Sequence, residues 1–317
     1  MAGISVTAGI SVTAGIEVGT GLPGAPGGAD TTGSPSIAAA ARAAEDMGLE
    51  SVWISDLILG DGTPALDAPL VLAAAAAATK RLRIGFSVLV VPLRPAPWLA
   101  AQVATLQHLS GNRLLLGVGS GGFPDSPFWQ AVGVSGRDRG RMTDVTLDLL
   151  PRLLTGDPVG LDGTRPPLVQ APAAVMPPLL VGGTEHAFDR VLRFGADWCP
   201  SLISPSGLAS AVGKLRESAV ERGLPMPGVT VGGHLIVGDD AEARAAYDAF
   251  VRNLVEVHGI PPEQASAVPI RARTPQELAE VFTDFHAAGA DRVVAGADNL
   301  DWMQSTEFLA AARAALP

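Results

Sequence analysis

Polar side chains that could carry out chemistry stand at or near the ends of short apolar runs in this sequence. Asp56 and Ser87 each follow such a run closely, and His234 lies inside another. A carboxylate can serve as a base, accept a hydrogen bond from a ligand or cap the next segment, whereas an imidazole exchanges protons near neutral pH. An imidazole in the middle of a strand is unusual unless it is used. We therefore regard His234 and Asp56 as the candidate catalytic residues.

Two glycine-rich segments end further apolar runs. Gly182, Gly183 and Thr184 stand directly before a predicted helix, and backbone N–H groups at the start of a helix bind anions. These residues form either a phosphate site or a plain tight turn that Thr184 caps. The other segment contains Gly119 and Ser120. Its small side chains leave room for a flat ligand or simply make a flexible loop.

Other kinds of reactive centre find no support in the sequence. The histidines show no metal-binding spacing, and neither HExxH nor GxSxG occurs, so we expect no metal site. Cys199 is the single cysteine, which excludes an internal disulfide and fits a reducing compartment. Beside Trp198 it is more typical of a core residue than of a catalytic thiol.

The charge and the hydropathy of the chain limit the classes of partner and the cellular location that we expect. A formal net charge of -10 argues against nucleic acid and against an anionic membrane surface as partners. No uninterrupted apolar run approaches the roughly 20 residues of a membrane span, and the N-terminus lacks the basic segment of a signal peptide. We expect a cytoplasmic protein that acts on a small molecule.

Short apolar runs alternate with helix-like segments along the chain. The runs lie at 16–19, 51–54, 83–88, 114–118, 178–182, 196–200, 229–237 and 291–295. Eight strands alternating with helices predict an α/β fold, a (β/α)8 TIM barrel with insertions in the loops at its C-terminal face. An open doubly wound sheet is the rival, but segment 19–24 matches GxGxxG only weakly.

Three segments depart from this alternation. Residues 1–13 are a short repeat and predict a disordered leader before a single domain over 14–317. Residues 157–178 are rich in proline and predict a long excursion, which at the C-terminal face of a barrel often forms a lid. Residues 260–273 predict a second irregular piece before the last strand.

Five motifs in order resemble the luciferase-like flavin-dependent oxidoreductases, which are (β/α)8 barrels that use FMN or the deazaflavin coenzyme F420. The resemblance runs from about Ile16 to the C-terminus. Its motifs are ARAAEDMGLESVWISD at 41–56, the stretch 81–95, LSGNRLLLGVGSG at 109–121, PPLLVGG at 177–183 and GADRVV at 289–294.

The resemblance implies where a cofactor of this kind would lie. Its ring would rest against the end of the third strand, where family members often have a non-proline cis peptide bond, and the matching residues are Ser87 and Val88. Residues 182–184 would bind its phosphate, and Gly119 and Ser120 would lie near the ribityl chain. One departure stands out: many members have a histidine directly after the aspartate, and here that residue is Leu57.

The resemblance implies a flavin-dependent monooxygenase as the leading hypothesis. Reduced FMN, supplied by a separate flavin reductase, would react with O2 and oxygenate a small hydrophobic organic substrate. The alternative is hydride transfer with coenzyme F420, and a second alternative, which Leu57 motivates, is a non-catalytic flavin-binding barrel. Trp98, Phe123 and Trp129 are the candidate substrate-binding residues, although they could equally pack helices. The resemblance also implies a homodimer.

Overall fold

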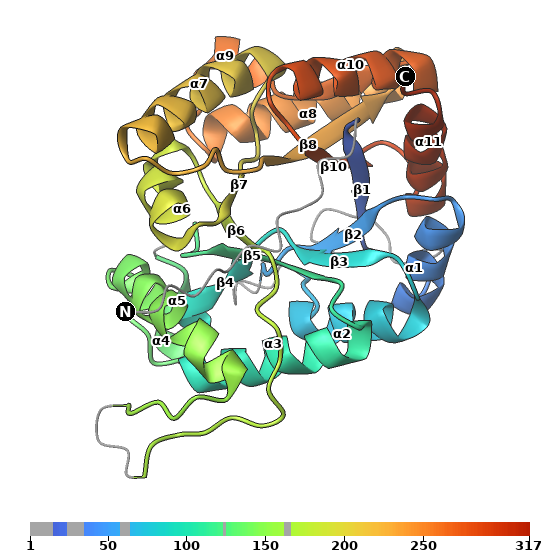
Figure 1. Cartoon of the computed structure of the whole chain (residues 1–317). Helices are drawn as coiled ribbons and strands as arrows, with labels where there is room; N and C mark the ends of the chain where they lie inside the picture. The colour runs from blue at the N-terminus through green and yellow to red at the C-terminus, as the bar shows by residue number, and fades with distance from the viewer. Residues whose placement is uncertain (1–14, 24–34, 58–63, 123–124, 162–165) are drawn as a thin grey trace.

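Parallel strands form the centre of the protein, and helices cover their outer side (Figure 1). The computed structural model describes residues 15–23, 35–57, 64–122, 125–161 and 166–317. The strands are β1 Glu17–Gly21, β2 Ser51–Ile54, β3 Arg83–Phe86, β4 Leu89–Val90, β5 Leu114–Gly119, β6 Leu179–Gly182, β7 Asp197–Cys199, β8 Thr230–Val237, β9 Ile270–Ala272 and β10 Arg292–Ala297. All eight predicted strands are therefore present.

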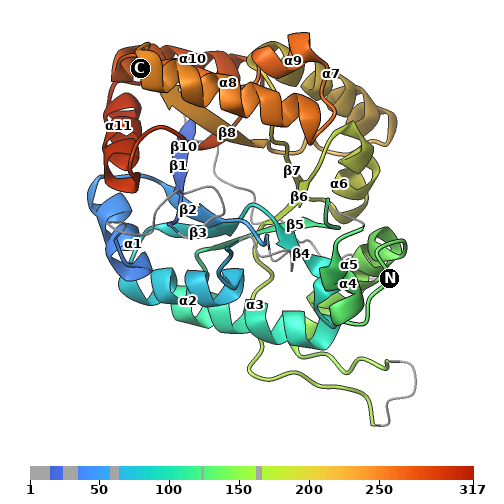
Figure 2. The same ribbon diagram turned by 180° about the vertical axis from the view of Figure 1, so that it is seen from behind.

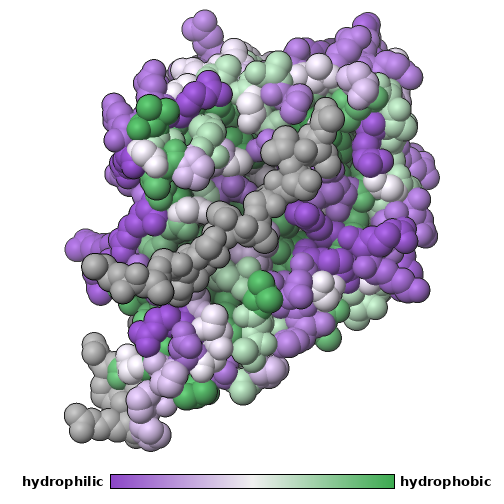
Figure 3. Space-filling view, in the orientation of Figure 1, coloured by the Kyte–Doolittle hydropathy of each residue, from purple (hydrophilic) through white to green (hydrophobic). Residues whose placement is uncertain are grey.

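Eleven α-helices and two 3-10 helices lie within the described residues. They are α1 Ile37–Asp46, α2 Ala68–Ala78, α3 Ala96–Ser110, α4 Pro127–Ala131, α5 Arg139–Thr155, α6 Phe188–Phe194, α7 Pro205–Glu221, α8 Ala241–Glu256, α9 Pro262–Ser266, α10 Pro275–Ala287 and α11 Trp302–Ala314, with η1 Val91–Leu93 and η2 Glu185–Ala187. The view from behind also shows helices around the sheet (Figure 2). The outer rim of the face in Figure 3 is largely hydrophilic.

The sheet is parallel throughout and strongly curled. Its strand order is β7-β6-β5-β3-β2-β1-β10-β8-β9, and β4 pairs with β5. Two isolated parallel bridges, Trp198 to Val229 and Ser201 to Gly232, join the β7 segment to β8. Every residue of β2 and β5 is buried, as is typical of parallel strands with both faces covered. The α/β class is confirmed, and a closed barrel of eight strands stays a prediction.

Apolar side chains from distant strands meet on the concave face of the sheet. One buried cluster combines residues of β2, β5, β6, β7 and β10, namely Trp53, Leu115, Leu180, Cys199 and Val294. β7 and β10 are far apart in the sheet order, so the side chains of all five strands meet only because the sheet curls. Burial raises the pKa of the Cys199 thiol to about 12, which fits the core role that the sequence indicates and not a nucleophile.

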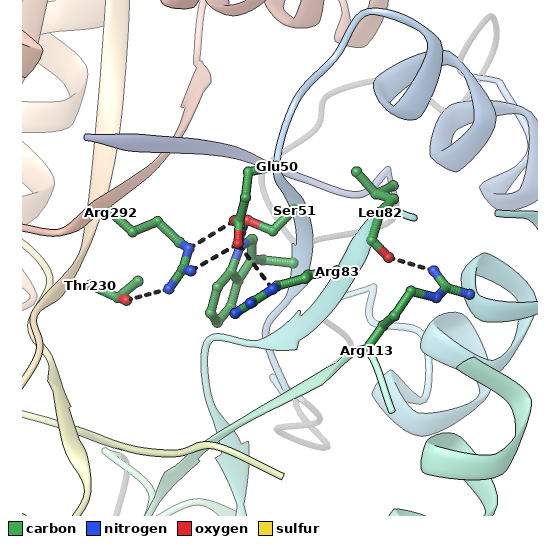
Figure 4. A network of polar contacts seen from close by, with 8 residues as sticks. Glu50, Ser51, Leu82, Arg83, Arg113, Thr230 and Arg292 are labelled. Atoms are coloured by element: carbon green, nitrogen blue, oxygen red, sulfur yellow. Dashed lines mark hydrogen bonds and ion pairs between the residues drawn. The ribbon is translucent and has the colours of Figure 1, made fainter. Parts of the chain in front are cut away.

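A polar network closes the N-terminal edge of the concave face, where the strands begin (Figure 4). Arg292 is 1% exposed; it donates to both oxygens of Glu50 at 2.8 Å and to Thr230 Oγ1 at 3.0 Å. Arg83 adds a contact of 3.4 Å to Glu50. Burial alone would raise the pKa of Glu50, but the Arg292 hydrogen bonds and charge hold that pKa below its ordinary value.

Two predicted irregular segments differ from expectation. The excursion at 157–178 follows the end of α5 and leads into the first residue of β6, so it lies at the N-terminal edge of the strands and extends away from the sheet (Figure 1). Gln107 of α3 donates to Val175 O at 2.7 Å, which fastens the excursion to that edge. The prediction of a lid at the C-terminal face is therefore wrong.

The segment 260–273 is more regular than predicted. It contains α9 and β9, and β9 pairs with Leu235–Val237 at the end of β8. The reason is the length of β8: its eight residues extend beyond the bridges to the β7 segment, and the remaining edge needs a hydrogen-bonding partner. The predicted leader at 1–13 lies outside the described residues.

Candidate functional site

The site is built at the C-terminal edge of the sheet, where parallel strands end and α/β proteins bind ligands. A buried ion pair fixes the loop after β3 at this edge. Arg94 donates to Asp56 Oδ2 at 2.6 Å and to Oδ1 at 3.2 Å, and Val90 N donates to Oδ2 at 2.9 Å. The side chain of Asp56 is fully buried. Because both of its oxygens already accept hydrogen bonds, this geometry favours a positioning role for Asp56 over the predicted role of a base.

The loop that Asp56 anchors contains the cis bond Ser87–Val88, as the resemblance implies. Ser55 Oγ donates to Ser87 O at 2.9 Å, and Ser87 N donates to Ile54 O at 2.9 Å. These contacts join the ends of β2 and β3. The backbone of residues 87–88 is thus held from two sides, by a serine hydroxyl and by the buried ion pair.

The Val88 side chain occupies the hollow between glycines of β5 and β6. A Cβ at Gly119 would lie 2.7 Å from Val88 Cγ2, and a Cβ at Gly182 would lie 2.8 Å from Cγ1. Carbon atoms in contact are normally about 3.5–4.0 Å apart. For the segment around Gly119 the sequence predicts either room for a flat ligand or a flexible loop, whereas the structure places the Val88 side chain against that glycine. A ligand would therefore meet Val88 rather than the glycine backbone.

In the part of the chain that the structure describes, the opposite half of the edge, formed by β1, β10 and β8, is open. Gly296 pairs in register with His234, as Arg292 pairs with Thr230 four residues earlier. These side chains share the concave face because strand residues alternate between faces. No described atom lies within 4 Å of a Cβ placed at Gly296 or at Gly21. We call the positions of Gly21, Gly296 and His234 the open half of the site.

His234 is the imidazole side chain in the open half. Its Nδ1 lies 3.1 Å from both carboxylate oxygens of Asp298, at the end of β10. Its ring packs on Phe250 of α8 with centroids 4.4 Å apart. The sequence identifies His234 and places Asp298 at the end of the last strand, but it does not pair them, because they are 64 residues apart.

The predicted phosphate segment, residues 182–184, reaches the surface before η2. Gly183 has φ +133° and its carbonyl accepts from Trp198 Nε1 at 2.9 Å. Thr184 is exposed, and its side chain makes no capping hydrogen bond. Glu185, the next residue, is held by Lys214 at 2.8 Å. The segment is thus accessible, but one carboxylate stands beside it.

Sequence reasoning missed Arg139, at the start of α5. Its Nε donates to Gly121 O at 3.2 Å and its Nη1 to Gly136 O at 2.7 Å. Both acceptors are neutral, and no ion pair forms between Arg139 and a carboxylate of the described residues. An arginine without a carboxylate partner beside a glycine loop can bind an anion. Nothing in the sequence distinguishes Arg139 from Arg141, which lies two residues later.

The candidate substrate-binding aromatics do not gather in one place. Trp98 is 62% exposed at the start of α3, on the outer layer of helices. Trp129 is 5% exposed and covers Gly121, where a Cβ would lie 2.8 Å from the indole ring. This arrangement favours the helix-packing alternative for Trp129. Phe123 lies outside the described residues.

In the described part of the chain, no group of three or more His, Cys, Asp or Glu side chains is arranged to hold a metal ion. In the same residues, no helix has both the length and the apolar character needed to cross a membrane.

Comparison with curated proteins finds relatives of several kinds. The chain is 30% identical over 210 residues to an uncharacterized protein of Mycobacterium tuberculosis, covering 59% of this chain and 72% of that protein. It is 36% identical over 115 residues to 4-hydroxyprotoasukamycin monooxygenase of Streptomyces nodosus subsp. asukaensis (36% and 30% of the two chains). It is 38% identical over 138 residues to F420-dependent glucose-6-phosphate dehydrogenase of Amycolatopsis mediterranei (40% of each).

Solved structures share the fold at low sequence identity. An F420-dependent secondary alcohol dehydrogenase matches with a TM-score of 0.76 at 19% identity, covering 96% of this chain and 99% of that one. The oxygenating constituent of 3,6-diketocamphane monooxygenase of Pseudomonas putida, in complex with FMN, matches with a TM-score of 0.66 at 17% identity, covering 93% and 96%. The family model described as luciferase-like monooxygenase matches residues 16–308. This chain therefore belongs to the luciferase-like monooxygenase family, as its motifs indicate.

Proposed function

We propose that this protein is a flavin-dependent monooxygenase that uses reduced FMN and O2 to oxygenate a small, largely hydrophobic organic substrate at the C-terminal edge of its sheet. The family match supports an enzyme over a non-catalytic barrel, and one relative is named a monooxygenase. The observation that carries the proposal is the Ser87–Val88 segment, which hydrogen bonds hold from two sides, opposite a half of the site where no described atom lies within 4 Å of a Cβ placed at Gly21 or Gly296.

The residues present fit a flat cofactor. Val88, held between glycines of β5 and β6, supplies an apolar wall, and the open half leaves space in front of it. Thr184 and the N–H groups of η2 would bind the cofactor phosphate together with Arg139, while Gly119 and Ser120 would lie along the ribityl chain. Bound and reduced, the cofactor supplies the electrons of the reaction, and the protein orients it and excludes water.

A second candidate is hydride transfer with coenzyme F420. The relative from Amycolatopsis mediterranei and one of the matching structures are both named F420-dependent. Both cofactors have a flat ring and a phosphate, so the same wall and the same anion site would serve either. His234 is the proposed proton-transfer residue in both reactions, since Leu57 stands where the resemblance implies a histidine.

The bridges between the β7 segment and β8 support a barrel closed by eight strands. A separate flavin reductase would supply reduced FMN. The exposed face of α2 carries Leu70, Ala74 and Ala77, and an apolar outer helix face of this kind supports a homodimer.

Equilibrium binding tests the cofactor first. Protein fluorescence is followed during separate titrations with oxidised FMN, reduced FMN and coenzyme F420. Selective binding of FMN supports the monooxygenase, and selective binding of F420 supports hydride transfer. Binding of neither cofactor would contradict both reactions.

The phosphate assignment needs a substitution that does not strain the backbone. Gly183 is unsuitable because its φ of +133° strains any L side chain. Thr184→Asp places a carboxylate at the same turn, on an exposed position with an extended backbone. We expect this variant to bind FMN at least about tenfold more weakly, by charge repulsion, and to bind riboflavin unchanged because riboflavin lacks the phosphate. Equal loss for both ligands would contradict the assignment.

A further inference from the structure

His234 has one ring nitrogen engaged by the protein and the other directed elsewhere. Nδ1 lies 3.1 Å from both oxygens of Asp298, whereas no hydrogen bond joins Nε2 to any other described residue. A carboxylate only accepts hydrogen bonds, so a proton on Nδ1 completes this contact. That proton leaves Nε2 of the neutral ring with its lone pair exposed.

The backbone holds the two partners in fixed relative positions. Asp298 N donates to Leu235 O at 2.9 Å, next to His234 on β8. Asn299 continues the connection: its side chain accepts from Val237 N at 2.9 Å and donates to Val237 O at 2.8 Å. The ends of β8 and β10 are thus fastened together directly beyond the His234–Asp298 contact. Phe250 fixes the plane of the ring from α8.

The described residues around His234 leave room for a ligand. Gly296 is its neighbour in register on β10, and no described atom lies within 4 Å of a Cβ placed there. On the other side of the site the space before β5 and β6 is filled by Val88. A small molecule held against Val88 would therefore have the imidazole in front of it.

We propose that Asp298 is a positioning residue: it accepts the Nδ1 proton of His234 and thereby presents Nε2 to the open half, where Nε2 exchanges a proton with a hydroxyl or carbonyl oxygen of the substrate. This inference rests on the proposed function. When Nε2 takes the proton of a hydroxyl, the O–H bond breaks, an N–H bond forms and the electron pair stays on the substrate oxygen. The Asp298 carboxylate offsets the positive charge that then develops on the ring.

Among the described residues, Asp298 is the charged group that contacts His234. Arg271 of β9, the strand beside the end of β8, lies over the Tyr247 ring at 5.0 Å, so its guanidinium is engaged elsewhere. Asp197 of β7 stands at the opposite, N-terminal end of its strand and accepts from Gly228 N at 2.8 Å. The ring therefore depends on one carboxylate for its tautomer.

The tautomer is measured on cofactor-free protein by long-range 15N NMR of the imidazoles. His234→Gln removes one of five histidine signals and so assigns it. We expect the Nδ1–H tautomer in the wild type and a majority of the Nε2–H tautomer in Asp298→Ala, with Asp298→Glu restoring the first. Asp301→Asn is the control, because Asn preserves the cap that Asp301 forms on α11. A wild-type ring protonated on Nε2, or no change in Asp298→Ala, would overturn the proposal.

The direction of Nε2 is tested in the same spectra with 2-propanol as a hydroxyl probe. We expect the probe to shift the Nε2 signal of His234 and to leave the exposed His108 and His258 unchanged. Gly296→Leu fills the open half and should reduce the shift at least about fivefold. An undiminished shift in Gly296→Leu would overturn this part of the proposal. Because these readings need no cofactor, a fixed tautomer in a protein that binds neither FMN nor F420 would refute the proposed function alone.

Discussion

Replacing Arg94 by methionine should destabilise the protein strongly, because the buried Asp56 then loses its cation. The Asp56 side chain is 0% exposed and that of Arg94 is 9% exposed. Breaking a buried ion pair from one side costs about 3–5 kcal/mol of unfolding free energy. Asp56 would keep one hydrogen bond, from Val90 N, which places the expected loss at the lower end, at about 3 kcal/mol.

A second ion pair in the same protein gives a matched control. Arg193 and Asp148 are also 2.6 Å apart, but their side chains are 52% and 53% exposed. An exposed pair contributes about 0–1 kcal/mol, so Arg193→Met should change the unfolding free energy by less than that. The shortest distance is equal in the two pairs, which differ in burial and in the second hydrogen bond that Arg94 donates to Asp56.

The assay is urea unfolding followed by tryptophan fluorescence for the wild type and both variants. We expect a midpoint clearly lower for Arg94→Met and nearly unchanged for Arg193→Met. Asp56→Asn combined with Arg94→Met should recover part of the loss, because the unpaired charge is then removed. Equal midpoints for the two single variants would refute the reasoning that Asp56 and Arg94 act as a buried clamp on the segment 87–88.

Three further predictions concern charge and assembly. Glu50→Gln should make the melting temperature depend less on pH in acid. The pKa of Glu50 is lowered in the folded protein, so the stability that its carboxylate contributes is lost as the pH falls below about 4.5. Thermal unfolding from pH 7 to pH 3 measures this dependence. Asp197→Asn should raise the melting temperature at pH 7 and lose that advantage in acid, because burial raises the pKa of Asp197, and the amide can still accept from Gly228. Leu70→Glu should turn a homodimer into a monomer in light scattering, and an unchanged mass would remove α2 from the interface.

The arrangement of strands and helices could be predicted from local patterns. A strand covered on both faces needs a continuous apolar run, and each of the eight runs became a strand. Glycines such as Gly111 and Gly156 end helices α3 and α5 with positive φ, as the helix C-cap requires. The apolar runs and the glycines lie within a few residues of the strand or helix that they define, so these elements can be predicted from the sequence of a single protein.

The excursion at 157–178 and the strand β9 could not be predicted in the same way. The edge of the sheet on which a loop lies depends on whether it follows a helix or a strand, and the helix α5 ends just before the excursion. The strand β9 has only three residues, and its pairing with β8 depends on how far the β7 segment extends along the same edge. Both outcomes follow from contacts between distant segments.

Local patterns predict the family, the eight strands and the residues that stand at their C-terminal ends, because each of these depends on a short stretch of the chain. Which of those residues come into contact depends on the fold of the whole chain. The fold buries Asp56 against Arg94 and places Val88 between glycines of β5 and β6. It also brings Asp298 into contact with His234, which is 64 residues away in the sequence. Such pairings arise from the register of parallel strands and the curl of the sheet, which no local stretch of sequence encodes.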